Sequence, residues 1–216
     1  MDREVVEIIF QIIVFLFAIS VHESAHAWSA SYFGDDTARL LGRISLNPIR
    51  HIDPIGTLLV PALAMLVGAP LFGWAKPTPM NTLRLRNRVR DNMLVSAAGP
   101  ISNFLIVFAV VIIYKIVLLT AGTNIPEESM LYPLTILLDM ALYINVILAI
   151  FNLLPIPPLD GSHILEGFLP DSLQAMYAEL RPFGFLLLLA AMRFLDLGVL
   201  YRPVIRFFNY LLYAGV

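Results

Sequence analysis

The chain has 216 residues, of which 59% are hydrophobic and 14% are charged, and its mean hydropathy is +0.81. A soluble domain is nearer half apolar and a quarter charged, so this composition excludes an ordinary soluble protein and predicts an all-α polytopic membrane protein, with residues 1–216 as a single domain. The net charge of −2 argues against a nucleic-acid partner. Because there is no cysteine, any metal must be held by His, Asp or Glu.

The apolar runs predict about three transmembrane helices, together with a re-entrant segment or extra span and C-terminal helices. Residues 5–33 read as one long helix that ends at Gly34. Its N-terminal residues lack the basic region of a signal peptide, so we expect this span to be retained. In chain order, the further segments are residues 55–72 (broken by prolines), spans at 93–120 and 133–154, a short helix and loop within 162–180, a span at 183–200, and residues 204–216, which are too short to cross and are expected in the interface.

The stretch VHESAHA, Val21 to Ala27, places two imidazoles and a carboxylate within the first apolar run. His22 and His26 are four residues apart, so they share one helix face and can bind one Zn²⁺. Glu23 can then reach a metal-bound water as general base. Structural polar residues are the alternative, but an ionisable residue at membrane depth is a functional hypothesis by default. The small residues around this motif are expected to serve close helix packing.

A catalytic zinc site needs a third protein ligand and an open position. Asp160 is the preferred candidate because it follows the prolines of FNLLPIPPLDG, which end a span. Non-helical backbone at membrane depth survives only where protein or a water-filled cavity surrounds it, and a carboxylate there can reach a neighbouring helix. The other acidic or imidazole candidates in apolar surroundings are Asp139, His163, Glu166 and Asp196.

HExxH in a first membrane helix, followed by AAGPISNF and then NLLPIPPLDG, resembles the site-2 protease family of intramembrane zinc metalloproteases. The resemblance covers residues 5–166. It implies one Zn²⁺ per chain, bound by His22, His26 and Asp160, with Glu23 as general base and proton shuttle. The substrate it implies is a transmembrane protein or peptide, cleaved within the lipid bilayer. The chain has no room for a PDZ-like or nucleotide-sensing domain and so looks like a minimal member.

The remaining polar residues near these motifs have less definite roles. Asn152 is expected to orient substrate or support the metal site, with a helix-capping or interhelical hydrogen bond as an equal alternative. Asn103 has the same two possibilities, of which the structural one is favoured. His163 is expected near the metal without binding it, since a fourth ligand would close the site. His51 is expected to anchor a loop at the interface.

Substrate binding raises a separate expectation. A transmembrane substrate must unwind before its peptide bonds can be cleaved, and an extended strand could then add to a free β-edge. Residues 39–46 partly alternate and could form a short β-hairpin that offers such an edge. An ordinary interfacial loop is the alternative.

The charges of the loops predict a topology in the cell membrane. Residues 73–92 carry five basic residues and one acidic residue, so this loop is placed in the cytoplasm, whereas the acidic loop 121–131 is placed outside. The active site then lies towards the cytoplasmic side. Both flanks of residues 55–72 become cytoplasmic, so this segment is expected to form a re-entrant hairpin bent near Pro61 or at Gly68 to Pro70. A single tilted span is the alternative.

Two functions outside proteolysis remain open. The first is a catalytically inactive binding or escort protein on the same fold, which would have no need of Glu23. The second is a zinc carrier, for which paired half-structures would be expected and none is found. The sequence leaves the substrate, its cleavage position and the oligomeric state open.

Overall fold

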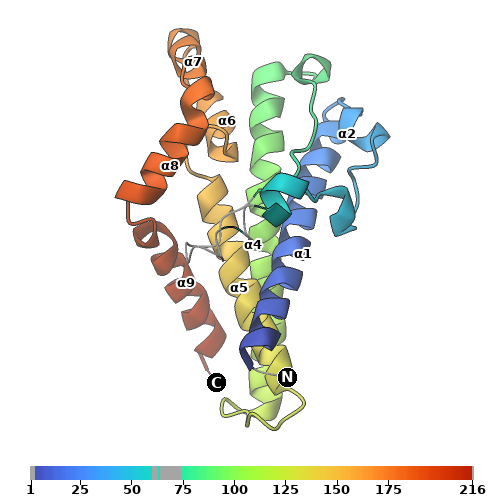
Figure 1. Ribbon diagram of the computed structural model, residues 1–216, viewed down its shortest axis with the longest axis vertical. Coiled ribbons are helices and arrows are strands. Elements are labelled where there is room, and N and C mark those ends of the chain that lie inside the picture. The colour runs from blue at the N-terminus through green and yellow to red at the C-terminus, as the bar shows by residue number, and fades with distance from the viewer. Residues whose placement is uncertain (1–2, 60–62, 64–73, 216) are drawn as a thin grey trace.

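The computed structural model describes residues 3–59, 63 and 74–215, and every regular element within them is helical. Three long helices, α1 (Arg3–Tyr32), α4 (Arg88–Ala121) and α5 (Tyr132–Asn152), run side by side along the long axis of the molecule (Figure 1). The all-α prediction is therefore confirmed. The shorter elements are α2 (Thr37–Leu40), η1 (Pro48–Arg50), η2 (Pro54–Leu59), η3 (Thr82–Arg84), α6 (Asp160–Glu166), α7 (Asp171–Ala178), η4 (Arg181–Phe183), α8 (Gly184–Phe194) and α9 (Gly198–Tyr213).

Within the described residues, four helical segments are long and apolar enough to cross a membrane: Val5–Tyr32, Arg88–Ala121, Tyr132–Asn152 and Asp171–Phe194. The first three match predicted spans. Helix α4 begins five residues earlier than predicted because the side chain of Asn87 accepts the backbone N–H of Arg90 and caps the first turn.

The C-terminal part differs from the prediction. Helix α8 ends at Phe194, and the Asp196 carboxylate accepts the backbone N–H of Gly198, 2.9 Å away, where α9 begins. The predicted span at 183–200 is therefore wrong in its second half. Residues 204–213 belong to the longer helix α9, which packs against α4 and α5, and their expected place at the interface stays a prediction.

The main core lies between α4, α5 and α9. It is built almost wholly from aliphatic side chains, which explains why the uniformly apolar faces of these helices associate. Its buried members are Val107, Val110, Val111, Tyr114, Leu118, Leu138, Leu142, Val146, Ile205, Phe208 and Leu212. On the other side, α1 packs against α4 and α5, and its small residues Ala18, Ala27 and Ala30 are fully buried. Small side chains allow helix backbones to approach closely, as predicted for the small residues around the HExxH motif, which include Ala27 and Ala30.

An extended segment, residues 74–81, runs beside α1 and is held by hydrogen bonds from its backbone. The Trp74 N–H bonds the Gly56 carbonyl at 3.1 Å, and the Lys76 N–H bonds the His51 carbonyl at 2.8 Å. The two flanks of the predicted re-entrant segment therefore lie side by side, as a hairpin requires. The predicted bends themselves, near Pro61 or at residues 68–70, lie outside the described residues.

The predicted β-hairpin at residues 39–46 is wrong. Residues 37–40 form α2, and Gly42 then turns the chain with φ of +68°. The backbone of Ser45, which a partner strand would have needed, bonds Ser24 on α1 instead: the Ser45 N–H lies 3.1 Å from Ser24 Oγ, and Ser24 Oγ donates to the Ser45 carbonyl at 2.6 Å. This segment therefore offers no free edge at its centre. The His51 ring, 2% exposed, also bonds the Ser45 carbonyl, at 2.7 Å from Nε2, so His51 anchors this loop as expected.

The carboxylate of Asp35 joins the end of α1 to the far end of the 74–81 segment. It is fully buried and accepts the backbone N–H groups of Thr37, at 3.0 Å, and of Asn81, at 2.6 Å. Burial by itself would raise the pKa of Asp35, but hydrogen bonds from the Thr37 hydroxyl and from these two N–H groups outweigh it, so the pKa is lowered.

We expect Asp35→Asn to destabilise the protein by about 1–3 kcal/mol at pH 7, because the amide places a donor where the carboxylate accepts a hydrogen bond. A lowered carboxyl pKa stabilises the fold above the ordinary value of about 3.9, and this stabilisation is lost as the pH falls through the folded-state value. Unfolding midpoints are measured in detergent at pH 7 and pH 3.5. The difference in midpoint between the wild type and Asp35→Asn should therefore be smaller at pH 3.5 than at pH 7. The half-exposed neighbour Asp36, changed to Asn, is the control and should cost less than about 1 kcal/mol. A gap of equal size at both pH values would contradict the role of the Asp35 charge.

Candidate metal centre

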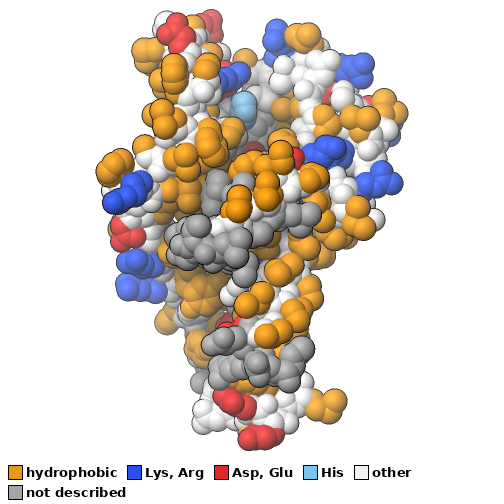
Figure 2. Space-filling model, viewed as in Figure 1, with side chains coloured by type: hydrophobic (Ala, Val, Ile, Leu, Met, Phe, Trp, Pro, Cys, Tyr) orange, Lys and Arg blue, Asp and Glu red, His pale blue; other side chains and the backbone are white. Residues whose placement is uncertain are grey.

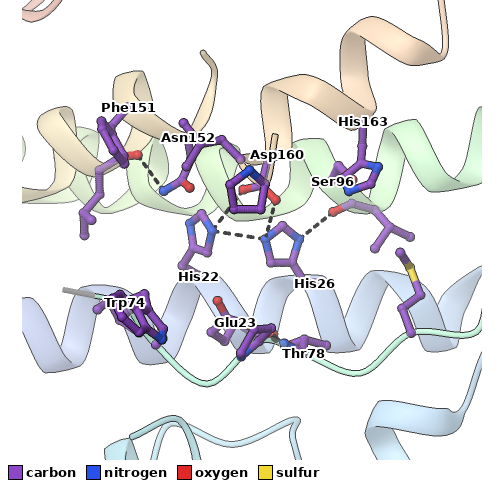
Figure 3. A pocket seen from close by; sticks show the side chains of 18 of the residues that line it. His22, Glu23, His26, Trp74, Thr78, Ser96, Phe151, Asn152, Asp160 and His163 are labelled. Carbon is purple, nitrogen blue, oxygen red and sulfur yellow. Dashed lines mark hydrogen bonds and ion pairs between the residues drawn. The ribbon is translucent and has the colours of Figure 1, made fainter. Parts of the chain in front are cut away.

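The rings of His22 and His26 are held by hydrogen bonds through the nitrogen that faces away from the centre. Nδ1 of His22 lies 2.7 Å from Asn103 Oδ1, and Nδ1 of His26 lies 2.8 Å from the Val95 carbonyl, both on α4. These oxygens can only accept, so each Nδ1 carries a hydrogen, and in the neutral ring each Nε2 keeps its lone pair for a metal. The two rings meet edge to face, with centroids 4.7 Å apart, and direct both Nε2 atoms to one point (Figure 3).

Asp160 reaches this point from the start of α6. The chain between α5 and α6 makes a tight turn that contains the cis peptide Pro157–Pro158. Gly161 follows, and a Cβ there would lie 2.2 Å from the Leu153 carbonyl oxygen, so only glycine fits against this turn. The turn thereby directs the Asp160 carboxylate back towards α1, as its position after the prolines predicts.

The three side chains present their donor atoms with the spacing of a zinc site. His22 Nε2 lies 3.1 Å from Asp160 Oδ2 and 3.1 Å from His26 Nε2, and His26 Nε2 lies 3.3 Å from Asp160 Oδ1. Ligand bonds of about 2.0 Å at tetrahedral angles place donor atoms about 3.3 Å apart. In addition, Asp160 Oδ2 is buried and accepts no hydrogen bond from the part of the chain that the structure describes. Two imidazole nitrogens and one carboxylate oxygen therefore fit zinc and leave a fourth position open.

The other candidate ligands lie elsewhere or are paired. Asp139 on α5 accepts a hydrogen bond from the Tyr114 hydroxyl at 3.2 Å, Glu166 pairs with Arg181, and Asp196 pairs with Arg202 at 3.4 Å. Among the described residues, the only cluster of three or more possible ligands is His22, His26 and Asp160.

Glu23 lies beside this cluster and makes no contact that would mark it as a ligand. Its Oε2 accepts two hydrogen bonds from Thr78, one from the backbone N–H at 2.9 Å and one from the hydroxyl at 2.7 Å. Figure 3 shows Glu23 between the 74–81 segment and the two imidazoles. A carboxylate in this place can exchange a proton with a water molecule near the metal position. No motif in the sequence indicated Thr78, which is 55 residues from Glu23 along the chain.

A cavity of about 460 Å³ surrounds these residues. One part of its wall is apolar and is formed by Phe15, Ile19, Leu148, Phe151, Phe185 and Leu188. Trp74 and Phe185 meet edge to face, with ring centroids 6.2 Å apart, so the 74–81 segment and α8 touch at the cavity wall. Elsewhere the wall includes Ser96, Thr78 and His163. The His163 side chain is 34% exposed, so the cavity opens to the surface of the molecule there.

Three residues were expected to support the metal centre or orient substrate, namely Asn103, Asn152 and His163, and each has a different environment. Asn103 is fully buried and orients His22, while its own amide donates to Asn145 Oδ1 at 2.9 Å. Asn145 was not predicted, although a buried asparagine within an apolar span is itself a signal. Asn152 lines the cavity and donates to the Leu148 carbonyl of its own helix at 2.9 Å, so its expected role in orienting substrate stays a prediction. His163 lies on the cavity wall, with its Nδ1 3.6 Å from the Glu166 carboxylate.

Gly99 is the glycine of the AAGPISNF motif, and its closeness to the two imidazoles was not predicted. A Cβ built on it would lie 2.4 Å from His26 Nε2 and 2.6 Å from His22 Nε2. Helix α4 therefore approaches the two metal-facing nitrogens so closely that no side chain fits between them.

Comparison with known proteins assigns the chain to a family. The family model for peptidase family M50 matches residues 123–191, which include Asn152, Asp160 and His163. YwhC of Bacillus subtilis, which its name describes as a candidate zinc metalloprotease, is 36% identical over 178 residues, covering 82% of this chain and 77% of that protein. The chain belongs to peptidase family M50, the site-2 proteases. This M50 peptidase is therefore a metallopeptidase with membrane-spanning helices, as the sequence predicts.

Two mycobacterial relatives share the same description. Rip2 of Mycolicibacterium smegmatis, also named as a candidate zinc metalloprotease, is 30% identical over 175 residues, covering 80% of this chain and 62% of that protein. Rip2 of Mycobacterium tuberculosis strain H37Rv is 29% identical over 182 residues, covering 81% of this chain and 62% of its own length. No solved structure matches the chain at a significant level.

Proposed function

We propose that this M50 peptidase hydrolyses peptide bonds of membrane-spanning proteins or peptides within the bilayer, using one zinc ion bound by His22, His26 and Asp160. The observation that carries this proposal is the convergence of three side-chain donors next to the carboxylate of Glu23, which lies outside their cluster and is hydrogen-bonded to Thr78. A zinc ion held there would lower the pKa of a water molecule to about 7 and polarise the scissile carbonyl.

Glu23 supplies the proton transfers. Its carboxylate takes a proton from the attacking water and later gives it to the amine that leaves. Asn103 and the Val95 carbonyl keep the imidazoles in the tautomer that presents Nε2 to the metal position, and with both Nε2 atoms bound to zinc neither histidine would compete with Glu23 as the base. A binding or escort protein, or a zinc carrier, has no use for this carboxylate.

The cavity suits an extended peptide rather than a helix, because a volume of about 460 Å³ holds only a few side chains. We assign the edge to which an extended substrate strand would add to the 74–81 segment and not to residues 39–46. This segment is extended and lines the cavity, and the backbone N–H groups of Ala75 and Met80 make no hydrogen bond with the described residues. The apolar part of the wall suits large apolar side chains, which are common in a membrane span.

We place the active site towards the cytoplasmic side of the cell membrane. His26 lies six residues before the end of α1, or about 9 Å, so the site is near that end of the helix. Figure 2 shows hydrophobic side chains over the middle of the molecule, and basic side chains at the end with α2 and the start of α4 and also beside α8 and α9. The acidic loop between α4 and α5, with Glu127 and Glu128, lies at the opposite end. Basic residues favour the cytoplasmic side.

The function is tested with the purified protein in proteoliposomes and a panel of single-span substrates labelled at both ends. We expect cleavage within the span of at least one substrate, loss of cleavage after chelation, and recovery on addition of Zn²⁺. A binding or escort protein would retain substrate uncleaved, and a carrier would move zinc across the bilayer without cleavage. Either result would replace the proteolytic proposal.

A further inference from the structure

We infer that Thr78 is a positioning residue that orients Glu23 for proton transfer. The inference rests on the proposed function, in which Glu23 is the general base, and it extends that function to a residue outside the metal-binding motifs. Thr78 belongs to the 74–81 segment, which no sequence motif connects with the metal centre.

The contacts between the two residues have a clear direction. The Thr78 N–H at 2.9 Å and the Thr78 hydroxyl at 2.7 Å both point to the same oxygen, Oε2 of Glu23. The hydroxyl also lies 3.1 Å from the Glu23 carbonyl oxygen, which places it against the α1 backbone. The other carboxylate oxygen, Oε1, accepts no hydrogen bond from the described residues. Two donors on Oε2 thus fix the carboxylate and leave Oε1 as the oxygen that can take a proton.

Thr78 can do this because its own backbone is fixed on both sides. Pro77 and Pro79 flank it, and proline restricts its own φ and the conformation of the residue before it. Two residues earlier, the Lys76 N–H bonds the His51 carbonyl at 2.8 Å, and three residues later the Asn81 N–H bonds Asp35 at 2.6 Å. The donors of Thr78 are therefore preorganised before any substrate arrives.

The catalytic consequence follows from the freedom of a glutamate side chain. Without these donors, Glu23 could rotate about three torsions, and its carboxylate would point towards the metal position for only part of the time. Proton transfer needs the base within hydrogen-bond reach of the water, and a misplacement of about 1 Å can cost about 100-fold in rate. Thr78 reduces this loss by acting through Glu23, the only residue to which its side chain donates a hydrogen bond among the described residues.

The test compares Thr78→Val, which removes the hydroxyl and keeps the shape, with Thr78→Ser, which keeps the hydroxyl. We expect Thr78→Val to lower kcat about 10- to 100-fold, a range typical of partners that orient active-site groups, with KM, zinc content and unfolding midpoint close to those of the wild type. Thr78→Ser should stay within about 3-fold of the wild-type kcat. Thr82→Val is the matched control, because the Thr82 side chain makes no hydrogen bond with the described residues, and it should leave kcat unchanged.

A double-mutant cycle shows whether Thr78 acts through Glu23. The shorter side chain in Glu23→Asp cannot keep both Thr78 contacts, so adding Thr78→Val to it should lower kcat by less than about 3-fold. The inference is overturned if Thr78→Val keeps kcat within about 2-fold of the wild-type value, or if Thr78→Ser is as slow as Thr78→Val. It is also overturned if KM or zinc content changes in place of kcat. The same holds if the effects of Glu23→Asp and Thr78→Val on the free energy of activation are simply additive. Glu23→Gln in the same assay separates the proposed function from the role of Thr78. Full activity of that variant would refute Glu23 as the general base, whatever Thr78 does.

Discussion

Glu23→Gln is expected to lower kcat by about 100- to 10,000-fold while the protein keeps about one zinc per chain. Glutamine has the shape of glutamate, and its amide oxygen can accept both hydrogen bonds that Thr78 now donates to Oε2. The amide nitrogen then occupies the place of Oε1, where it cannot accept a proton. Binding of metal and substrate should therefore survive, and only the proton transfer is lost. The measurement is the initial rate of substrate cleavage in proteoliposomes, with zinc determined by mass spectrometry on the same samples.

Asp160→Asn provides the contrast for this variant. Asp160 is one of the three donors that converge, so its replacement by a neutral amide should lower zinc content as well as activity. The pair of variants separates the base from the ligands. If Glu23→Gln lost its zinc, Glu23 would be a ligand, and if it kept a substantial fraction of wild-type activity, another group would be the base.

Gly99→Ala is expected to remove zinc binding although it adds a single methyl group. The new Cβ would lie 2.4 Å from His26 Nε2 and 2.6 Å from His22 Nε2, far inside van der Waals contact. The rings cannot simply turn away, because Asn103 and the Val95 carbonyl hold them from the other side. We expect at least about a 10-fold loss of zinc affinity, with a similar or greater loss of activity.

The position of Gly99 before Pro100 requires a control for folding, since a Cβ before proline disfavours helical backbone. The helicity and the unfolding midpoint of zinc-free Gly99→Ala, compared with those of the zinc-free wild type, show whether α4 is intact. A loss of zinc affinity is attributed to the added Cβ only if both quantities are unchanged. Ala109→Val adds bulk to an exposed position of the same helix and should bind zinc as the wild type does. An intact Gly99→Ala variant with wild-type zinc affinity would show that the metal position differs from the one inferred here.

Local patterns in the sequence determined much of this protein. Long apolar runs predict α1, α4 and α5, because a helix is the structure that satisfies its own backbone in a bilayer. The four-residue spacing of His22 and His26 places both on one helix face whatever the rest of the fold does. The prolines before Asp160 indicate where a helix ends. These properties depend on neighbours in the chain, so they can be read without a tertiary structure.

The tertiary structure alone decided which distant residues surround the site. Several acidic residues could have served as the third ligand, and only the turn after α5 brings one of them, Asp160, to the imidazoles. The expected hairpin at 39–46 did not form, because Ser24 on α1 takes the hydrogen bonds that a strand would have used. Thr78 meets Glu23, and Asn103 meets Asn145, across 55 and 42 residues of chain. Such contacts depend on how close two helices or segments come after packing, a distance that small residues such as Gly99 permit but that no local sequence pattern specifies.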